Sequence, residues 1–225
     1  MKLIIIDVNG LLLHREFVHS TKKRNISPSH VIGKFNIYLR TGTVDFLHWC
    51  AQNFVVVIWG TAAKLNLDSL LPVLFPGDTQ PALVLNGDDC TTTNIFDPFK
   101  PGKELLLKDI TKVWNAAEIT KLGLFNENNS LMIDDAFYKM ILNPTWCCVS
   151  PRSWDPSKNI NTFENLYDLL SMYRASESSQ ECTSSFAFDG AVWNLDRNDN
   201  MSNLLRAHIV REGRSEAERL VPLCF

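Results

Sequence analysis

The sequence predicts an α/β protein in which helices cover both faces of a parallel sheet, that is, a Rossmann-like three-layer sandwich. Short apolar runs of strand length alternate with longer segments of helical period, which is the pattern of a βαβ chain. The 225 residues, 45% of them apolar, suffice for one full core, and the length fits one domain with an appendage better than two domains. We therefore expect one α/β core with additional segments.

Five of the apolar runs are short and continuous, as is typical of strands that are buried on both faces. These expected strands span residues 3–6, 55–59, 82–85, 131–133 and 146–149. The longer segments between them carry apolar stripes of helical period, which we interpret as core packing. The expected helices span residues 43–52, 62–74, 110–122 and 162–173.

Three segments depart from this alternation. Residues 14–36 are polar and basic, with a proline and a glycine, and predict a long loop or hairpin inserted after the first strand that could cover a site. Residues 86–101 predict a second, irregular excursion rich in Asp and Thr. We expect a domain at 1–174, followed at 175–225 by a polar linker and a C-terminal extension of unassigned role, in which 202–211 is a weak helix candidate.

The charge balance limits the classes of partner. Lys and Arg number 22 against 25 Asp and Glu, a formal net charge of -3, so no global basic field attracts nucleic acid or anionic lipid, and any anion site must be local. The six cysteines lack zinc-ligand spacing, which favours reduced thiols. No segment reads as a signal peptide or membrane span. We expect a soluble cytoplasmic or nuclear protein without a direct nucleic-acid or membrane partner.

Polar residues follow several of the apolar runs. Open parallel sheets bind ligands at the carboxyl ends of their strands. Phosphoryl transfer needs a nucleophile, a cation and a magnesium site, and these polar residues are of the types that could supply them. Each feature alone is more often a turn, a helix cap or a solvated lysine. Their order and placement together favour a phosphate site built around Asp7. The features are Asp7-Val-Asn9-Gly10, Trp59-Gly60-Thr61, Lys108 and Asp134-Asp135.

Six motifs carry a resemblance to a known family. They are Leu-Ile-Ile-Ile-Asp7-Val-Asn9-Gly10, Leu39-Arg40-Thr-Gly42, Val57-Ile-Trp59-Gly60-Thr61, Leu107-Lys108-Asp109, Leu131-Met-Ile-Asp134-Asp135-Ala-Phe-Tyr-Lys139 and Leu142-Asn-Pro144. From Lys2 to about Tyr173, the chain resembles the RNA polymerase II C-terminal-domain phosphatases and the NLI-interacting-factor family. These belong to the haloacid dehalogenase superfamily, so the resemblance implies that fold type without a large cap domain.

The resemblance also implies an aspartyl-phosphate mechanism. Asp7 matches the family nucleophile, which forms a covalent intermediate that water later hydrolyses. Lys108 matches the cation that balances the nucleophile and contacts the phosphate. Asp134 and Asp135 match the acidic pair that holds Mg²⁺ together with Asp7 and a main-chain carbonyl at the position of Asn9.

Two departures from the family pattern bear on turnover. The pattern Asp-x-Asp-x-Thr places a general acid and base where this chain has Asn9, and a threonine where it has Leu11. An amide cannot exchange protons at neutral pH, and general acid-base catalysis contributes about 10²- to 10⁴-fold. In the second motif Gly60 separates Trp59 from Thr61, so either the Thr61 hydroxyl or backbone N–H groups at the helix start would bind phosphate.

Two functions therefore follow. The first is a Mg²⁺-dependent phosphatase-like enzyme with weakened turnover, acting on a phosphorylated Ser or Thr of a protein or peptide, or on a small phosphate ester. The alternative is an inactive pseudophosphatase that binds a peptide or serves as a scaffold, similar to the mitochondrial inner-membrane translocase receptor of this family. That receptor has a presequence and a membrane anchor, which do not precede the first strand here. A mitochondrial location is expected only if the N-terminus is incomplete.

Overall fold

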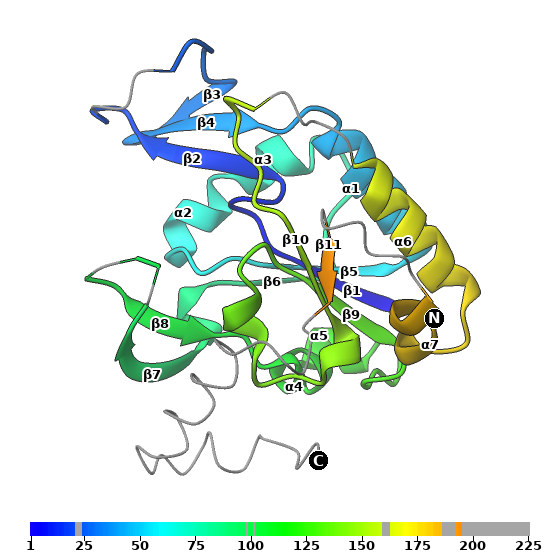
Figure 1. Ribbon diagram of the computed structural model, residues 1–225. Helices are drawn as coiled ribbons and strands as arrows, with labels where there is room; N and C mark the ends of the chain where they lie inside the picture. The colour runs from blue at the N-terminus through cyan, green and yellow to red at the C-terminus, as the bar shows by residue number, and fades with distance from the viewer. Residues whose placement is uncertain (21–23, 98, 101, 159–162, 186–191, 195–225) are drawn as a thin grey trace.

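The computed structural model describes residues 1–20, 24–97, 99–100, 102–158, 163–185 and 192–194. Its centre is a six-stranded sheet in the order β11-β10-β9-β1-β5-β6 (Figure 1). The strands are β1 (Leu3–Ile6), β5 (Val55–Trp59), β6 (Leu83–Leu85), β9 (Ser130–Ile133), β10 (Cys148–Pro151) and β11 (Val192–Asn194). The first five run parallel, and β11 pairs antiparallel with β10. The predicted α/β class with a central parallel sheet is confirmed.

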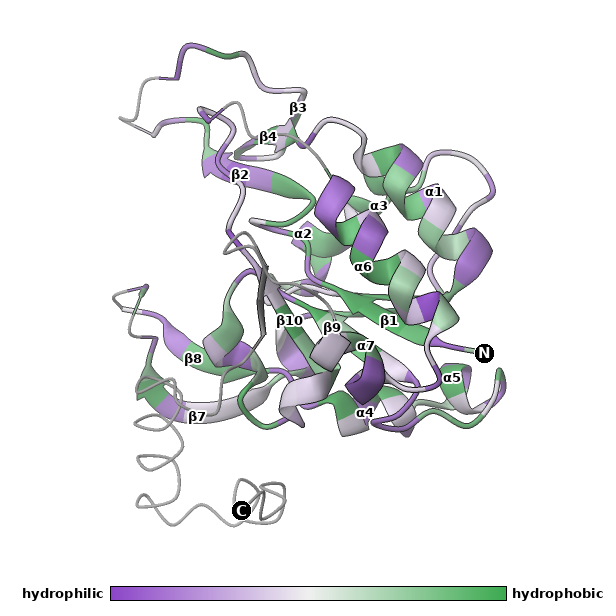
Figure 2. Ribbon diagram, turned by 45° about the vertical axis from the view of Figure 1, so that its right-hand side comes forward, coloured by the Kyte–Doolittle hydropathy of each residue, from purple (hydrophilic) through white to green (hydrophobic). Residues whose placement is uncertain are grey.

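Alternate residues of β1 point to opposite faces of the sheet and enter two separate cores. Ile4 and Ile6 pack on the side of α1 (Thr43–Asn53), α2 (Lys64–Asp68), α3 (Leu71–Leu74) and α6 (Glu164–Ala175). Leu3 and Ile5 pack on the side of α4 (Ile110–Trp114) and α5 (Ala117–Thr120). In Figure 2 the central strand β1 is green, whereas α1 and α6 also carry purple polar residues. This is the three-layer arrangement that the apolar runs predicted.

Two small antiparallel sheets are appended to the core. The predicted insertion is a three-stranded sheet in the order β2-β4-β3, formed by β2 (Leu13–Phe17), β3 (His30–Ile32) and β4 (Phe35–Leu39). The second excursion contains the 3₁₀ turn η1 (Gly87–Asp89) and β7 (Thr91–Phe96), which pairs with β8 (Glu104–Leu107). Figure 1 shows both sheets projecting from the same side of the central sheet, with α2 between them.

The description of residues 86–101 as irregular is wrong in part. Thr91 and Thr93 are buried while Thr92 and Asn94 between and after them are exposed, which is the alternation of a strand. The β-branched threonines suit that conformation, and Thr91 and Thr92 pair with Leu107 and Leu106 of β8 before the register shifts.

Other expected elements also differ from the prediction by one or two residues at their ends, and three of them differ for an identifiable reason. The helix expected at 62–74 is two short helices, because Pro72 cannot donate a backbone hydrogen bond in mid-helix and instead lies at the start of α3. The helix expected at 110–122 divides at Ala116, whose backbone is extended. The strand expected at 146–149 begins two residues later, because the 3₁₀ turn η3 (Thr145–Cys147) follows Pro144.

The chain beyond residue 174 starts with a packed segment. Helix α7 (Ser179–Ser185) lies in the stretch that the sequence suggested as a linker. The Ser179 amide donates to Asn128 O at 2.8 Å, and Cys182 is buried in the same core as Ile4. The domain boundary at 174 stays a prediction, and the helix candidate at 202–211 lies outside the described residues. Across the described part of the chain, no helix has both the length and the apolar character needed to cross a membrane.

Candidate active site

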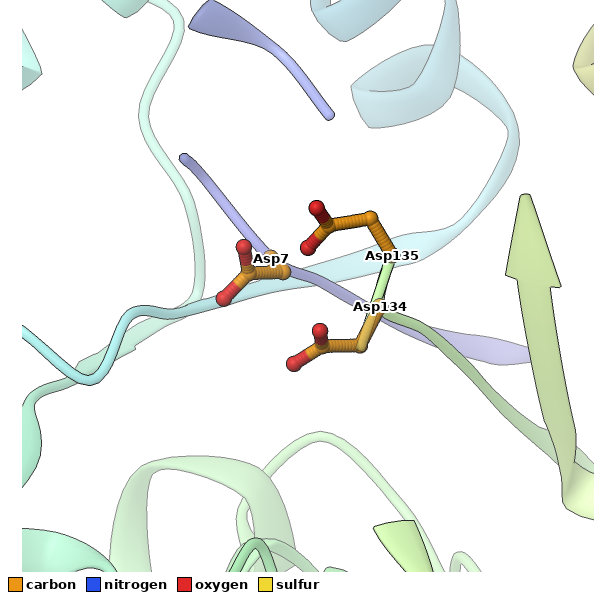
Figure 3. A group of neighbouring side chains, drawn as sticks. All are labelled: Asp7, Asp134 and Asp135. Atoms are coloured by element: carbon orange, nitrogen blue, oxygen red, sulfur yellow. The ribbon is translucent and has the colours of Figure 1, made fainter. Parts of the chain in front are cut away.

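Three carboxylates meet at the carboxyl ends of two adjacent strands. Asp7 directly follows β1, and Asp134 and Asp135 directly follow β9. Because β1 and β9 are parallel and Ile6 pairs with Ile133, the two strand ends coincide. One oxygen from each carboxylate lies within 4.8 Å of the others (Figure 3). The structure therefore brings together three of the predicted site residues.

Lys108 reaches this cluster from outside the central sheet. It follows β8, a strand of the two-stranded sheet, and not a strand of the parallel sheet as its predicted position at the carboxyl edge implied. Its side chain is 1% exposed, and Nζ donates to Asp7 Oδ1 at 2.6 Å and to Asp134 Oδ2 at 2.5 Å. Asn143 Nδ2 donates to Lys108 O at 2.7 Å and so fixes the backbone that carries this lysine.

A second buried lysine, Lys139, was assigned no role from the sequence. It lies in the 3₁₀ turn η2 (Phe137–Met140), and its Nζ is 3.8 Å from Asp134 Oδ1. Its backbone carbonyl also accepts from the amide of Lys108 at 2.8 Å. The sequence feature that could have indicated a role for Lys139 is its position four residues after Asp135. Three carboxylates thus face two ammonium groups, which leaves one unbalanced negative charge when all three carboxylates are ionised.

Electrostatic effects in the cluster follow from burial and from this charge balance. Burial alone would raise the pKa of Asp134, but Lys108 and Lys139 lower it to about 2. Burial, together with Asp134 and Asp7, raises the pKa of Asp135 to about 7. Burial and Asp134 also raise the pKa of Asp7 against the opposing effect of Lys108. Both lysines keep a raised pKa despite burial, because the carboxylates stabilise their charge.

The donor set at this position suits a divalent cation. Asp7, Asp134 and Asp135 offer carboxylate oxygens, the ligands that Mg²⁺ prefers, and the cluster has an unbalanced negative charge that a cation would offset. The residues present therefore fit the metal that the resemblance implied.

Asn9 and Gly10 form the turn beside the carboxylates. Asn9 is exposed, and its Oδ1 accepts from the backbone N–H of Arg15 at 2.9 Å. Gly10 has φ +96°, and a Cβ at this position would lie 2.1 Å from Asp135 Oδ2. The amide of Trp154 donates to Gly10 O at 2.7 Å and fixes the turn. Gly10 is therefore required both for its backbone conformation and for the approach of Asp135. The sequence indicated a possible turn at Asn9-Gly10 but not the approach of Asp135.

We expect Gly10→Ala to destabilise the fold and to displace Asp135. The matched control is Gly77→Ala, since Gly77 has φ +86° but nothing within 4 Å of the position that a Cβ would occupy. Both variants carry the left-handed backbone penalty, and the clash should cost Gly10→Ala about 1–3 kcal/mol more. Thermal or denaturant unfolding with and without Mg²⁺ measures this. Equal losses in the two variants would contradict the proposed contact.

A cleft of about 770 Å³ opens over the cluster. Asp7, Asn9, Gly60, Thr61 and Lys139 are among its lining residues, so the predicted phosphate-binding pair lines the same cleft as Asp7. Gly60 is held there because its amide donates to the carbonyl of Leu85 in the neighbouring strand β6 at 3.0 Å. The cleft thus gives an external ligand access to Asp7.

The fold and this cluster together define a phosphatase-type α/β domain. The sequence pattern of the NLI interacting factor-like phosphatase family matches residues 2–181. The chain belongs to this family, and the resemblance to the C-terminal-domain phosphatase branch of the haloacid dehalogenase superfamily is confirmed.

Individual relatives are distant. The chain is 25% identical over 149 residues to an uncharacterized FCP1 homology domain-containing protein of Schizosaccharomyces pombe, covering 64% of this chain and 57% of the relative. The structure of Fcp1, an essential RNA polymerase II CTD phosphatase, matches with a TM-score of 0.47 and 12% identity over 93% of this chain and 62% of that one. A variant of the fission yeast CTD phosphatase Fcp1 bound to beryllium fluoride matches with a TM-score of 0.41 and 11% identity, over 97% of this chain and 66% of that one. The chain thus spans less than two thirds of each relative.

Proposed function

We propose that this chain is a Mg²⁺-dependent phosphatase-type protein that accepts a phosphoryl group on Asp7, with turnover weakened by Asn9. The phosphoryl donor is a phosphorylated Ser or Thr of a protein, or a small phosphate ester. The observation that carries the proposal is the position of Asp7, which lines the cleft while Lys108 Nζ donates to it at 2.6 Å. A buried carboxylate that accepts a hydrogen bond from a lysine and that a ligand can reach through a cleft is suited to nucleophilic catalysis.

The contacts of Asp7 indicate which oxygen attacks. Lys108 occupies Oδ1, and within the described part of the chain no hydrogen bond reaches Oδ2. As a lone pair of Oδ2 forms the bond to phosphorus, the bond from phosphorus to the leaving oxygen breaks, and that oxygen keeps the electron pair. Lys108 and Lys139 hold positive charge close to this step.

Magnesium would be held by Asp7, Asp134 and Asp135, with the main-chain carbonyl of Asn9 as the further ligand that the family resemblance implies. Bound there, the ion would supply positive charge that offsets the charge on the phosphoryl oxygens. Gly60 and Thr61 line the cleft near Asp7 and are proposed as phosphate donors through backbone N–H or hydroxyl groups.

The amide of Asn9 weakens both chemical steps in this proposal. It cannot protonate the leaving oxygen, so alkyl phosphates, whose alkoxides are poor leaving groups, should react slowly, whereas aryl or acyl phosphates can still transfer to Asp7. It also cannot accept a proton from the water that attacks the phosphorylated Asp7. We therefore expect a long-lived phosphoenzyme with aryl phosphates.

A second candidate function is a pseudophosphatase that binds a peptide without phosphoryl transfer. The observation that favours it is the loss of two family groups at once, since Asn9 replaces the acid and base, and Leu11, fully buried, replaces a threonine. The same cleft would then serve as the peptide site.

One experiment separates the two functions. Purified protein is incubated with an aryl phosphate and either Mg²⁺ or EDTA, and mass spectrometry is used to search for phosphorylated Asp7. We expect a phosphoenzyme in the wild type and in the control Asp45→Asn, an exposed site on α1, and none in Asp7→Asn or with EDTA. The absence of both phosphoenzyme and Mg²⁺ binding would leave the pseudophosphatase as the better description.

A further inference from the structure

The cleft over Asp7 is basic although the protein as a whole is acidic. The net charge of the chain is -3, yet five Lys and Arg side chains line the cleft against two acidic ones. A cleft with one sign of charge focuses the field and attracts ligands of the opposite sign. The basic residues are Arg15, Arg24, Lys100, Lys103 and Lys139, and the acidic ones are Asp7 and Glu16.

Two of these basic residues are already neutralised by carboxylates. Arg24 Nε pairs with Glu16 at 2.7 Å, and its Nη1 pairs with Asp155 at 2.9 Å. Lys139 faces Asp134 at 3.8 Å. The positive charges of Arg24 and Lys139 are therefore balanced by carboxylates of the protein itself, and neither residue offers excess charge to a ligand.

The other three have no such partner. Within the described residues, no carboxylate oxygen lies within 4.0 Å of the charged nitrogens of Arg15, Lys100 or Lys103. The Arg15 guanidinium lies over the ring of Phe35, 4.4 Å from its centroid. Partial burial is the largest effect on the pKa of both Arg15 and Lys100 and lowers it, and at Lys100 the more distant carboxylates of Asp97, Asp135 and Asp7 offset only part of this effect.

Hydrogen bonds within the protein hold the described residues beside the two lysines. Asp97 N donates to Lys103 O at 2.8 Å, and Lys103 N donates to Lys100 O at 3.1 Å. The Asp97 carboxylate accepts from Phe99 N at 2.8 Å and from the Tyr138 hydroxyl at 3.3 Å, so it holds the turn. The two lysines therefore lie in the segment that joins β7 to β8, while Arg15 lies in β2 of the other appended sheet. Figure 1 shows these two sheets on the same side of the central sheet.

We propose that Arg15, Lys100 and Lys103 form a subsite for a second anionic group of the substrate, so that the protein selects acidic phosphopeptides. Such a peptide carries a further carboxylate or phosphate close to the phosphorylated residue that reaches Asp7. This inference rests on the proposed function, in which the cleft receives a phosphorylated protein segment. It adds a requirement on the sequence around the phosphorylated residue.

The test compares fluorescent phosphoserine peptides of one length that differ only in flanking residues. One has neutral flanks, one has glutamates, one has a second phosphoserine and one has lysines. Binding to the wild-type protein is measured by anisotropy at low and high salt. Ion pairs at exposed or half-exposed sites are individually weak, so the acidic peptides should bind about tenfold more tightly than the neutral one, and salt should reduce this ratio.

The decisive variant is the double charge reversal of Lys100→Glu with Lys103→Glu, alongside Arg15→Gln. The matched control is Lys121→Glu, an exposed lysine outside the cleft. The double reversal should abolish the preference for acidic flanks and favour the lysine-flanked peptide, an inversion that local unfolding would not produce. The control should keep the wild-type ratio. A second phosphoserine that outperforms glutamate would identify phosphate as the preferred second group, and the reverse would identify carboxylate.

An unchanged ratio in the double reversal, or equal binding of all four peptides by the wild type, would overturn the subsite. The phosphoenzyme assay with an aryl phosphate is independent of these flanks. If acidic peptides are preferred without a phosphoenzyme, the subsite holds and the catalytic proposal fails. If a phosphoenzyme forms without any peptide preference, the catalytic proposal holds and the subsite fails.

Discussion

Replacing Asn9 with aspartate is expected to raise Mg²⁺-dependent hydrolysis of a phosphoserine peptide by about 10²- to 10⁴-fold, the usual contribution of a positioned general acid and base. The gain should be larger for the peptide than for an aryl phosphate, because a seryl leaving group needs the proton more. With an aryl phosphate, the fraction of protein held as phosphorylated Asp7 in the steady state should fall, since the new carboxylate also deprotonates the attacking water.

The structure indicates that this substitution is tolerated. Asn9 is exposed, and its Oδ1 accepts from the Arg15 amide at 2.9 Å, a hydrogen bond that a carboxylate oxygen accepts equally well. No hydrogen bond from Asn9 Nδ2 to the described residues would be lost when oxygen replaces it. The expected change therefore lies in chemistry and not in stability.

The control for the Asn9 experiment is Asn115→Asp, which adds the same charge at an exposed position outside the cleft. Initial rates and quenched mass spectra should match those of the wild type in this control. Equal rates for wild type and Asn9→Asp, with the phosphoenzyme unchanged, would show that the missing carboxylate does not limit turnover.

Replacing Lys108 with methionine should have the largest effect on the site as a whole. The methionine keeps an apolar stem of similar length but leaves Asp7 and Asp134, both almost fully buried, without the cation that donates to each. Breaking a buried ion pair in this way costs about 3–5 kcal/mol. Phosphoryl transfer to Asp7 should also slow by about 10²- to 10³-fold, because a preorganised positive charge is lost.

Added Mg²⁺ should restore part of this lost stability. The increase in melting temperature with Mg²⁺ should be larger for Lys108→Met than for the wild type, because the variant has one more negative charge to offset. Lys112→Met is the control, since the Lys112 ammonium is exposed and donates to the Asp89 carbonyl at 3.0 Å. A stability of Lys108→Met within about 0.5 kcal/mol of this surface control would refute the buried ion-pair network.

The sequence by itself determined the α/β class, the family and the strands that carry Asp7 and the Asp134-Asp135 pair. These were readable because continuous apolar runs of strand length, such as Val55–Trp59, are buried on both faces and therefore have a local signature. The sequence also predicted the loss of a carboxylate at Asn9, because this change concerns one side chain at a known position of the Asp-x-Asp-x-Thr motif.

Tertiary structure alone decided how the remaining site residues are arranged. Lys108 directly follows a strand outside the central sheet and Lys139 lies in a 3₁₀ turn, and both meet Asp134 through contacts between separate elements. The need for glycine at position 10 depends on the place of Asp135, and the basic cleft depends on residues that both appended sheets contribute. Periodicity reports which face of an element is buried, but it does not report which distant side chain lies against that face, because that choice is made by packing between elements.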